Sequence, residues 1–307
     1  ILMRYDIKKR AFIFDNKAEA KPCALLFHDL PHLLSPGEEI CPEAYQLAER
    51  LPQLRATVGM DGGCEGALFH QVEAIGWGAC MRGTGIIAYG MGLGKTFIAI
   101  RMCTALGRKR VLVVCPSHLK HNWRKEIALW EPISPCHVCK GRNSDMPAGA
   151  RFTLINRDIL ADNLHALQLQ GFDQVIVDEC HKCGGWGTQT YKALDALCKD
   201  MRANGGGILL LTGTLFKNSP MDAHTALHLL DPRIPGGRGD FQSRFDPIGK
   251  RKEEVMGLMK RKSAPQWLIR RKWAEIRELE KWHGKNGDVE GLRWLLSQYA
   301  IRKQYRD

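Results

Sequence analysis

The stretch IIAYGMGLGKTFIAI, from Ile86 to Ile100, places three glycines and a lysine between two apolar runs. The first run is short and continuously apolar, which is typical of a buried strand, and the second is long enough to continue as a helix. Glycines between a strand and a helix let several backbone N–H groups point at one anion, and the helix N-terminus adds a partial positive charge. This stretch therefore predicts a loop that binds phosphate groups.

The side chains of this loop indicate that the phosphate belongs to a nucleotide. We expect Lys95 to reach the β- and γ-phosphates and the Thr96 hydroxyl to bind Mg²⁺. The strict phosphate-loop pattern has glycine where this chain has Tyr89, but the G-x-G-K-T core is intact. The alternative is a glycine turn with a chance Lys-Thr pair, and the strand before it and the helix after it argue against that. The residues predicted to bind the nucleotide here are Met91, Gly92, Leu93, Gly94, Lys95 and Thr96.

A second apolar run ends in acidic residues. In QVIVDECHK, residues 174–182, Asp178 and Glu179 directly follow a predicted buried strand. A phosphate loop needs a carboxylate at the end of a neighbouring strand to hold Mg²⁺, and we assign this role to Asp178. We assign to Glu179 the orientation and deprotonation of the attacking water, and to His181 a link to a neighbouring loop. A strand end emerging into solvent would explain the acids alone, but not their combination with the phosphate loop.

A third apolar run, LLLTGT at 209–214, ends in two threonines that flank a glycine. Hydroxyl groups at the end of one strand can hydrogen-bond an acidic motif at the end of the next. We therefore predict that Thr212, Gly213 and Thr214 connect the nucleotide site to a bound polymer. Taken alone, the T-G-T sequence would be an ordinary turn.

Around these three motifs, apolar runs alternate with segments of helical spacing, and the predicted strands are continuously apolar. Both features predict an α/β fold with a mostly parallel sheet and helices on both faces. Strands are predicted at 85–89, 110–116, 151–156, 174–179 and 207–214. Helices are predicted at 68–81, 96–106, 118–130, 157–168 and 190–202. From Pro232 onward no regular pattern is visible.

The first 60 residues give weaker patterns, which we interpret as a small N-terminal accessory segment or extension. Within it, RAFIFD at 10–15 predicts a strand and PEAYQLAERL at 42–51 predicts a helix. The glycine-rich DGGCEG at 61–66 predicts a linker.

Composition points to a polyanionic partner. The formal net charge is +12, and 8 of these charges come from residues 250–307, where 16 Lys and Arg face 8 Asp and Glu. Such a balance favours nucleic acid, although solubility alone could also explain it. No apolar run reaches the length of a membrane span, so we expect no membrane partner. Eleven cysteines, several in apolar stretches, predict reduced thiols and an intracellular location in the cytoplasm or nucleus.

The motifs GMGLGKT, CPSHLKHNW, VDECH and LTGT, in this order and spacing, resemble motifs I, Ia, II and III of superfamily 2 helicases. More narrowly, the chain resembles the Snf-type DNA translocases. HQVEAIGW at 70–77 is similar to their upstream glutamine segment, and LSQYAIRKQYRD at 296–307 is similar to the basic segment that closes their first lobe. The resemblance implies a RecA-like nucleotide-binding lobe over residues 61–307, with a basic closing segment at 250–307.

The resemblance also implies functions for residues outside the phosphate loop. Gln71 would read the adenine of ATP, while Ser117 and Lys120 would join the T-G-T loop in contacting the phosphates of duplex DNA. Nothing here resembles motifs IV to VI, which carry an arginine finger in a second lobe. We therefore expect a second lobe in the full-length protein, and expect this chain alone to bind ATP with Mg²⁺ but to hydrolyse it poorly.

The sequence leaves other interpretations open. A related superfamily 2 enzyme, such as an RNA helicase or a restriction-type motor, is the nearest alternative, and a non-catalytic, ATP-gated DNA-binding module is a more distant one. The C-x-x-C pairs at 136–139 and 180–183 are typical of zinc sites, but one lies inside the acidic motif, so we do not expect zinc. For the tryptophans at 267, 273, 282 and 294, we favour core packing over base stacking.

Overall fold

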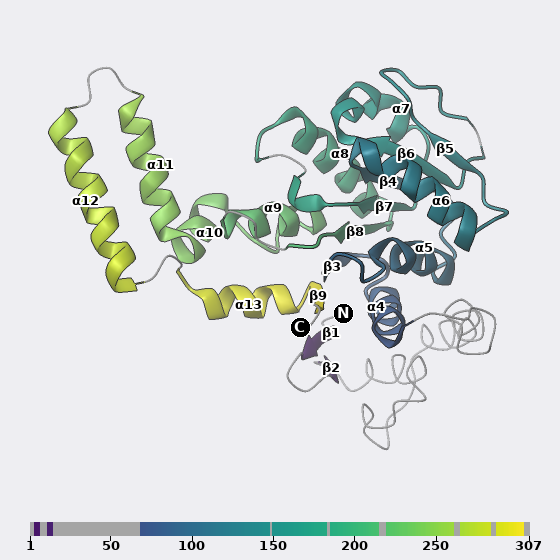
Figure 1. Cartoon of the computed structure of the whole chain (residues 1–307), viewed down its shortest axis with the longest axis horizontal. Coiled ribbons are helices and arrows are strands. Elements are labelled where there is room, and N and C mark those ends of the chain that lie inside the picture. The colour runs from purple at the N-terminus through teal and green to yellow at the C-terminus, as the bar shows by residue number, and fades with distance from the viewer. Residues whose placement is uncertain are drawn as a thin grey trace. The chain divides into compact units, whose positions relative to one another are not determined.

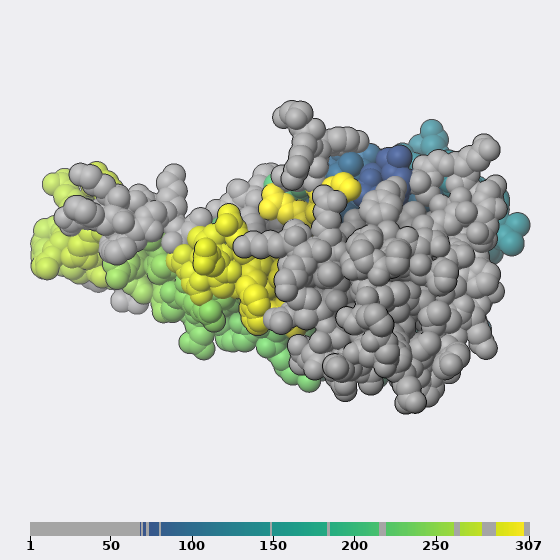
Figure 2. Space-filling model, turned by 90° about the horizontal axis from the view of Figure 1, so that it is seen from below, coloured from purple at the N-terminus to yellow at the C-terminus, as the bar shows by residue number. Residues whose placement is uncertain are grey.

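The computed structural model describes residues 68–147, 149–182, 185–214, 219–260, 265–283 and 287–303, and the backbone of residues 3–6 and 11–14. The remaining residues are grey in Figure 2. Contacts divide the chain into two compact units, Ile1–Thr214 with Ser297–Asp307, and Leu215–Leu296. The strand predicted at 10–15 is confirmed, since β2 (Ala11–Phe14) pairs antiparallel with β1 (Met3–Asp6). The helix predicted at 42–51 and the linker at 61–66 lie outside the described residues.

The first unit is built on a parallel sheet (Figure 1). Within the described residues it has seven strands in the order β5-β6-β4-β7-β8-β3-β9, and every neighbouring pair is parallel. The predicted fold class is therefore confirmed. The strands are β3 (Gly85–Tyr89), β4 (Val111–Cys115), β5 (Cys136–Val138), β6 (Phe152–Asn156), β7 (Gln174–Val177), β8 (Gly207–Leu211) and β9 (Ala300–Lys303).

Helices cover both faces of this sheet. Three of them, α4 (Phe69–Cys80), α5 (Lys95–Ala105) and α6 (Lys120–Trp130), share one apolar core with alternate strand residues such as Ile87 and Val113. Because successive strand residues point to opposite faces, Ile86 and Leu112 face the other side. There, α8 (Gln189–Ala203) contacts β7 and β8.

The prediction of one helix at 157–168 is wrong for the first half of this segment. The structure has two 3₁₀ turns, Arg157–Ile159 and Ala161–Asn163, before the short helix α7 (Leu164–Gln168). The buried Asn163 amide donates to the carbonyl oxygens of Ile159 (2.8 Å) and Gly141 (3.1 Å). Side-chain hydrogen bonds of this kind compete with helical ones, which explains the interruption.

The second unit is helical, although no pattern was visible beyond Pro232. Its helices are α9 (Met221–Leu230), α10 (Arg238–Phe245), α11 (Pro247–Met259), α12 (Gln266–His283) and α13 (Val289–Ser297), which ends in the first unit. α11 and α12 pack through one narrow apolar stripe of Ile248, Val255, Ile269 and Ile276. Each helix contributes two residues seven positions apart, and the charged residues around them hide this spacing in the sequence.

The structure corrects the prediction that the tryptophans of the basic segment pack in a core. Trp273 packs against the α11–α12 stripe, as predicted. Trp267 and Trp294 are instead 64% and 57% exposed. Trp267 lies two residues before Ile269, and two residues turn a helix by about 200°, so its side chain points away from the stripe. The side chain of Trp282 lies outside the described residues.

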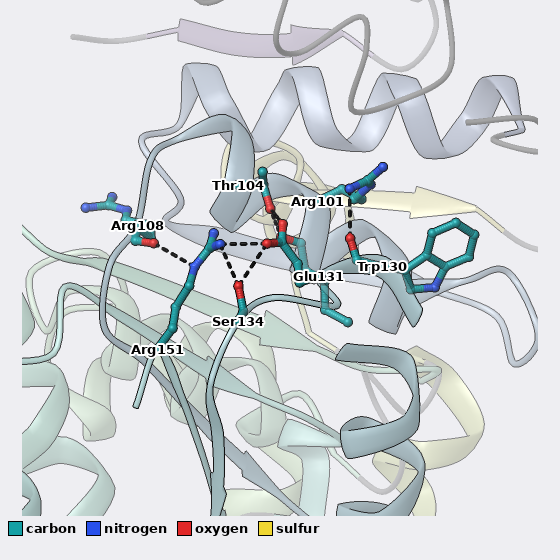
Figure 3. Close-up of polar contacts among 8 residues, drawn as sticks. Arg101, Thr104, Arg108, Trp130, Glu131, Ser134 and Arg151 are labelled. Carbon is teal, nitrogen blue, oxygen red and sulfur yellow. Dashed lines mark hydrogen bonds and ion pairs between the residues drawn. The ribbon is translucent and has the colours of Figure 1, made fainter. Parts of the chain in front are cut away.

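A buried acidic side chain joins the ends of α5 and α6 (Figure 3). Glu131, 7% exposed, accepts hydrogen bonds from Thr104 at the end of α5, from Ser134 Oγ (3.1 Å) and from Arg151 Nη1 (2.6 Å) before β6. Arg101 of α5 donates to the carbonyl oxygen of Trp130 (3.0 Å), the last residue of α6. These bonds hold α5, which follows the phosphate loop, against α6, which contains the end of the CPSHLKHNW motif.

Replacing Glu131 with alanine should lower the free energy of unfolding by roughly 3 kcal/mol, because the Arg151 guanidinium would lose its buried carboxylate. Urea titration followed by circular dichroism measures this change. Glu253→Ala is the matched control, since Glu253 is exposed and lies 3.9 Å from Arg238. Equal, small effects of both substitutions would show that the Glu131 contacts do not stabilise the unit.

Candidate nucleotide-binding site

The three motifs meet at the carboxyl ends of three neighbouring strands. β8 lies between β3 and β7 in the sheet. The phosphate loop follows β3, the T-G-T loop follows β8 and the acidic motif follows β7. Parallel strands end at the same edge, so topology alone brings these loops together, as expected for a nucleotide site in an open α/β sheet.

The phosphate loop has the backbone that its glycines predict. Gly92 and Gly94 adopt positive φ angles of 79° and 76°, which only glycine takes up readily. A Cβ atom at Gly94 would also clash with the side chain of Gln71. Gly94 is the N-cap residue of α5, so the N-terminus of that helix faces the site. Of the two apolar residues of the loop, Met91 is exposed and Leu93 is buried.

The glutamine segment is fixed directly to this loop. His70 Nε2 lies 3.1 Å from the carbonyl oxygen of Leu93, and the Tyr89 hydroxyl donates to the carbonyl oxygen of His70 (3.1 Å). The unusual Tyr89 therefore ties α4 to the end of β3. Gln71 Oε1 accepts the backbone N–H of Leu68 (2.9 Å), which holds the amide over Gly94.

Lys95 lies between the loop and the acidic motif. Its Nζ donates to the carbonyl oxygens of Tyr89 (2.9 Å) and Gly90 (3.1 Å). Burial lowers the pKa of Lys95, while the nearby Glu179 and Asp178 carboxylates act to raise its pKa. A cation close to two acids at the carboxyl ends of the strands is the arrangement that a Mg²⁺–triphosphate site requires.

Asp178 is held by two hydrogen bonds. Its Oδ2 accepts from the indole N–H of Trp123 (2.8 Å) and its Oδ1 from the backbone N–H of Glu179 (2.9 Å). Burial raises the pKa of this carboxyl, and the two hydrogen bonds counteract that shift. Glu179 has a φ of 49°, in the left-handed region that non-glycine residues rarely occupy. Such backbone strain is common at functional positions.

The acidic motif and the T-G-T loop form the predicted hydrogen-bond link. His181 Nδ1 lies 3.0 Å from Thr212 Oγ1 and 3.2 Å from Glu179 Oε2. The Thr212 hydroxyl donates to the carbonyl oxygen of Thr214 (2.7 Å), so its oxygen accepts from His181 Nδ1–H. A Cβ atom at Gly213 would lie 3.9 Å from Lys95 Nζ, which places this loop directly beside the phosphate loop.

The donor set of the site fits Mg²⁺. Each Asp178 oxygen accepts one protein hydrogen bond, and a carboxylate oxygen has room for a second ligand. Mg²⁺ prefers few protein oxygens together with phosphates and water, which agrees with one carboxylate and the Thr96 hydroxyl. Among the described residues, no three His, Cys, Asp or Glu side chains form a metal-binding group. Cys183 lies outside them, so the expectation of no zinc stays a prediction.

Two of the residues predicted to contact DNA, Ser117 and Lys120, border an open groove on the β5 side of the sheet, whereas Thr212, Gly213 and Thr214 do not line it. Two adjoining cavities of about 560 and 300 Å³ share Arg124, Val138 and Lys140 in their linings. The predicted Ser117 and Lys120 line the smaller one, where Lys120 Nζ donates to Cys139 O and Asn156 Oδ1, both at 2.8 Å. The Lys and Arg side chains of the groove are Lys120, Arg124, Lys140 and Arg142, and its lining also includes His121, His137 and the acidic Asp145.

Sequence reasoning missed Arg124, Lys140 and Arg142. Arg124 and Lys140 are exposed and have no hydrogen bond or ion pair with any other described residue. Arg142 pairs with Asp162 at 3.1 Å. The basic CKGR sequence at 139–142, which directly follows β5, was the available signal.

Comparison with known proteins identifies the family. The model of the SNF2-related domain matches residues 70–303, which include the glutamine segment, the phosphate loop, the acidic motif and the T-G-T loop. The chain belongs to the SNF2-related domain family. The Snf-type resemblance of the motifs is thereby confirmed.

Relatives of this SNF2-related chain include proteins of DNA repair. It is 28% identical over 190 residues to the human DNA repair and recombination protein RAD54-like, covering 54% of this chain and 25% of that protein. It is 25% identical over 241 residues to Switch 2 of Arabidopsis thaliana, covering 71% and 25%. The chain thus spans about a quarter of the length of these relatives.

Solved structures confirm the fold. The Sulfolobus solfataricus SWI2/SNF2 ATPase core in complex with dsDNA matches with a TM-score of 0.56 and 20% identity, covering 78% of this chain and 44% of that one. The Sulfolobus solfataricus SWI2/SNF2 ATPase core domain matches with a TM-score of 0.57 and 19% identity, covering 78% of this chain and 43% of that one. No helix within the described residues is both long and apolar enough to span a membrane.

Proposed function

We propose that this chain is the ATP-binding first lobe of a DNA-dependent ATPase that moves along duplex DNA. The observation that carries the proposal is the position of Lys95 beside the Asp178 and Glu179 carboxylates, at the ends of strands that flank β8. We further propose that residues 61–307 form this lobe, that a second lobe acts with it, and that the protein works inside the cell.

Each residue of the site has a role in the proposed hydrolysis of ATP. The amides of the loop and the Lys95 ammonium hold the phosphates, and Gln71 lies beside them where it can meet the adenine. Mg²⁺, when held by Thr96 and Asp178, neutralises charge that develops on the phosphates. Glu179 orients the attacking water and accepts its proton.

The His181–Thr212 hydrogen bond provides the proposed connection to DNA. When Glu179 accepts the proton of the attacking water, its contact with His181 changes, and His181 transmits this change to the T-G-T loop. We assign to this loop, together with Ser117 and Lys120, the contacts with the DNA backbone. Two observations support DNA as the partner: the basic groove beside Ser117 and Lys120, and relatives whose names specify DNA repair or a complex with dsDNA. Backbone contacts of this kind hold DNA without reading its sequence.

Reversing the charges of the groove should weaken DNA binding. The double substitution Arg124→Glu and Lys140→Glu should reduce affinity for a mixed-sequence duplex by at least about tenfold at low salt, because each lost phosphate contact removes counterion release. The slope of log K against log salt should fall by about 1 for each side chain that contacts a phosphate. Fluorescence anisotropy measures both quantities.

Lys109→Glu is the control for this experiment. Lys109 is exposed, precedes β4 and does not line the groove. An unchanged affinity and salt slope for the double variant, or equal losses for the control, would remove the groove from the proposed DNA path.

The alternatives differ in measurable activity. ATP turnover by the chain together with a second lobe should rise on addition of duplex DNA and not on addition of RNA. Stimulation by RNA alone would support an RNA helicase. Nucleotide binding without any turnover, even with both lobes and DNA present, would support the non-catalytic module.

A further inference from the structure

One side chain of α6, Trp123, contacts the carboxylate of Asp178, to which we assign the binding of Mg²⁺. Trp123 is 1% exposed, and its indole N–H donates to Asp178 Oδ2 at 2.8 Å. An indole nitrogen is a donor only, so this bond orients the carboxylate without competing for a metal ion. Because Trp123 is buried, bulk water does not compete for this hydrogen bond.

The bond also fixes which oxygen of Asp178 faces which neighbour. Oδ1 accepts the N–H of Glu179, whose backbone is held at a φ of 49°. With Oδ2 bonded to Trp123, rotation of the carboxylate is restrained from both sides. The remaining lone pair of each oxygen then keeps a constant direction.

We propose that Trp123 is a positioning residue of the nucleotide site, which presents the Asp178 carboxylate to the Mg²⁺ ion of a bound nucleotide. This inference rests on the proposed ATP-binding function. Trp123 lies one turn of α6 after Lys120, whose helix borders the basic groove. The same helix therefore carries the indole that orients Asp178 and two of the basic side chains of the groove, Lys120 and Arg124.

The test is the Mg²⁺ dependence of nucleotide binding by this chain. Binding of a fluorescent ATP analogue, mant-ATP, is measured with saturating Mg²⁺ and with EDTA. In Trp123→Phe the ratio of the mant-ATP affinity with Mg²⁺ to the affinity with EDTA should fall by about 10- to 100-fold. This is the usual effect of removing a hydrogen bond to a metal ligand. The affinity in EDTA should stay unchanged, because the phosphate loop is intact.

Trp130→Phe is the matched control. Trp130 lies on the same helix, but its indole N–H donates to Glu126 Oε2 (2.8 Å) and does not reach the site. This variant should bind as the unsubstituted chain does in both conditions. In the Asp178→Asn background, Trp123→Phe should cause no further loss of the Mg²⁺ effect, because the two changes act through one carboxylate.

Removal of a large buried indole can also unfold the chain. Nuclear magnetic resonance of the unsubstituted chain gives an independent readout: the Trp123 indole ¹H resonance should shift when Mg²⁺ is added to the nucleotide complex, and the Trp130 resonance should not. Equal losses of affinity with Mg²⁺ and EDTA, or an unmoved Trp123 resonance, would overturn the proposal while leaving ATP binding intact. Absence of nucleotide binding in the unsubstituted chain would overturn the proposed function and this inference with it.

Discussion

Replacing Lys95 with alanine is expected to remove ATP turnover almost completely. The ammonium group lies over the phosphate loop, bonded to the carbonyl oxygens of Tyr89 and Gly90 and close to both acids. Without it, no side chain of the loop carries positive charge to the transferred phosphate. Loss of one such preorganised donor lowers kcat by about 10²–10³-fold. Release of phosphate, measured with both lobes and duplex DNA, gives this value.

A surface lysine provides the comparison for Lys95→Ala. Lys199 on α8 is exposed, so Lys199→Ala should leave turnover unchanged. Circular dichroism should show that both variants remain folded. DNA-stimulated turnover that survives in Lys95→Ala would show that the G-x-G-K-T loop does not bind the phosphates.

The second large effect is expected for Glu179→Gln. The amide keeps the size of the side chain but cannot accept the proton of the attacking water. Loss of a general base costs about 10²–10⁴-fold in rate. Affinity for mant-ATP with Mg²⁺ should change little, because Glu179 is not assigned to the nucleotide or to the metal. Glu179→Gln should therefore lower the rate of turnover while the affinity for mant-ATP stays nearly unchanged.

Glu254→Gln on α11 is the control, since Glu254 is exposed and distant in sequence from every motif. If turnover with both lobes and DNA is already absent before the substitution, Glu179 has no catalytic role and the chain is a binding module. If Glu179→Gln weakens binding as strongly as turnover, Glu179 acts on the nucleotide itself and the assigned role is wrong.

The sequence was sufficient to predict the parallel sheet and the residues at its edge. Continuous apolar runs between helical segments predict parallel strands, and Gly92, Gly94 and Lys95 follow one such run directly. The contact between His181 and Thr212 was also predictable, because both follow strands and parallel strands end at one edge. The strand order, with β8 between β3 and β7, was not predictable, since every candidate strand is equally apolar.

Contacts between residues distant in sequence were the main omission. Trp123 and Asp178 are 55 residues apart, and a tryptophan on an amphipathic helix is most simply explained as core packing. The α11–α12 pair was missed because its stripe contains so few apolar residues among many charges. The groove was missed because Arg124 and Lys140 belong to different elements, which only the packing of α6 beside β5 brings together.

The most direct test of a shared phosphate and metal site is electron paramagnetic resonance of Mn²⁺, used in place of Mg²⁺. Titrating Mn²⁺ into the chain should show weak binding alone and tight binding when ATP is present, because the phosphates and Asp178 hold the ion together. Lys95→Ala and Asp178→Asn should each abolish the tight, ATP-dependent signal, whereas Lys199→Ala should keep it. Tight ATP-dependent Mn²⁺ binding that persists in Asp178→Asn would contradict the account, because the acidic motif would then play no part in the nucleotide site.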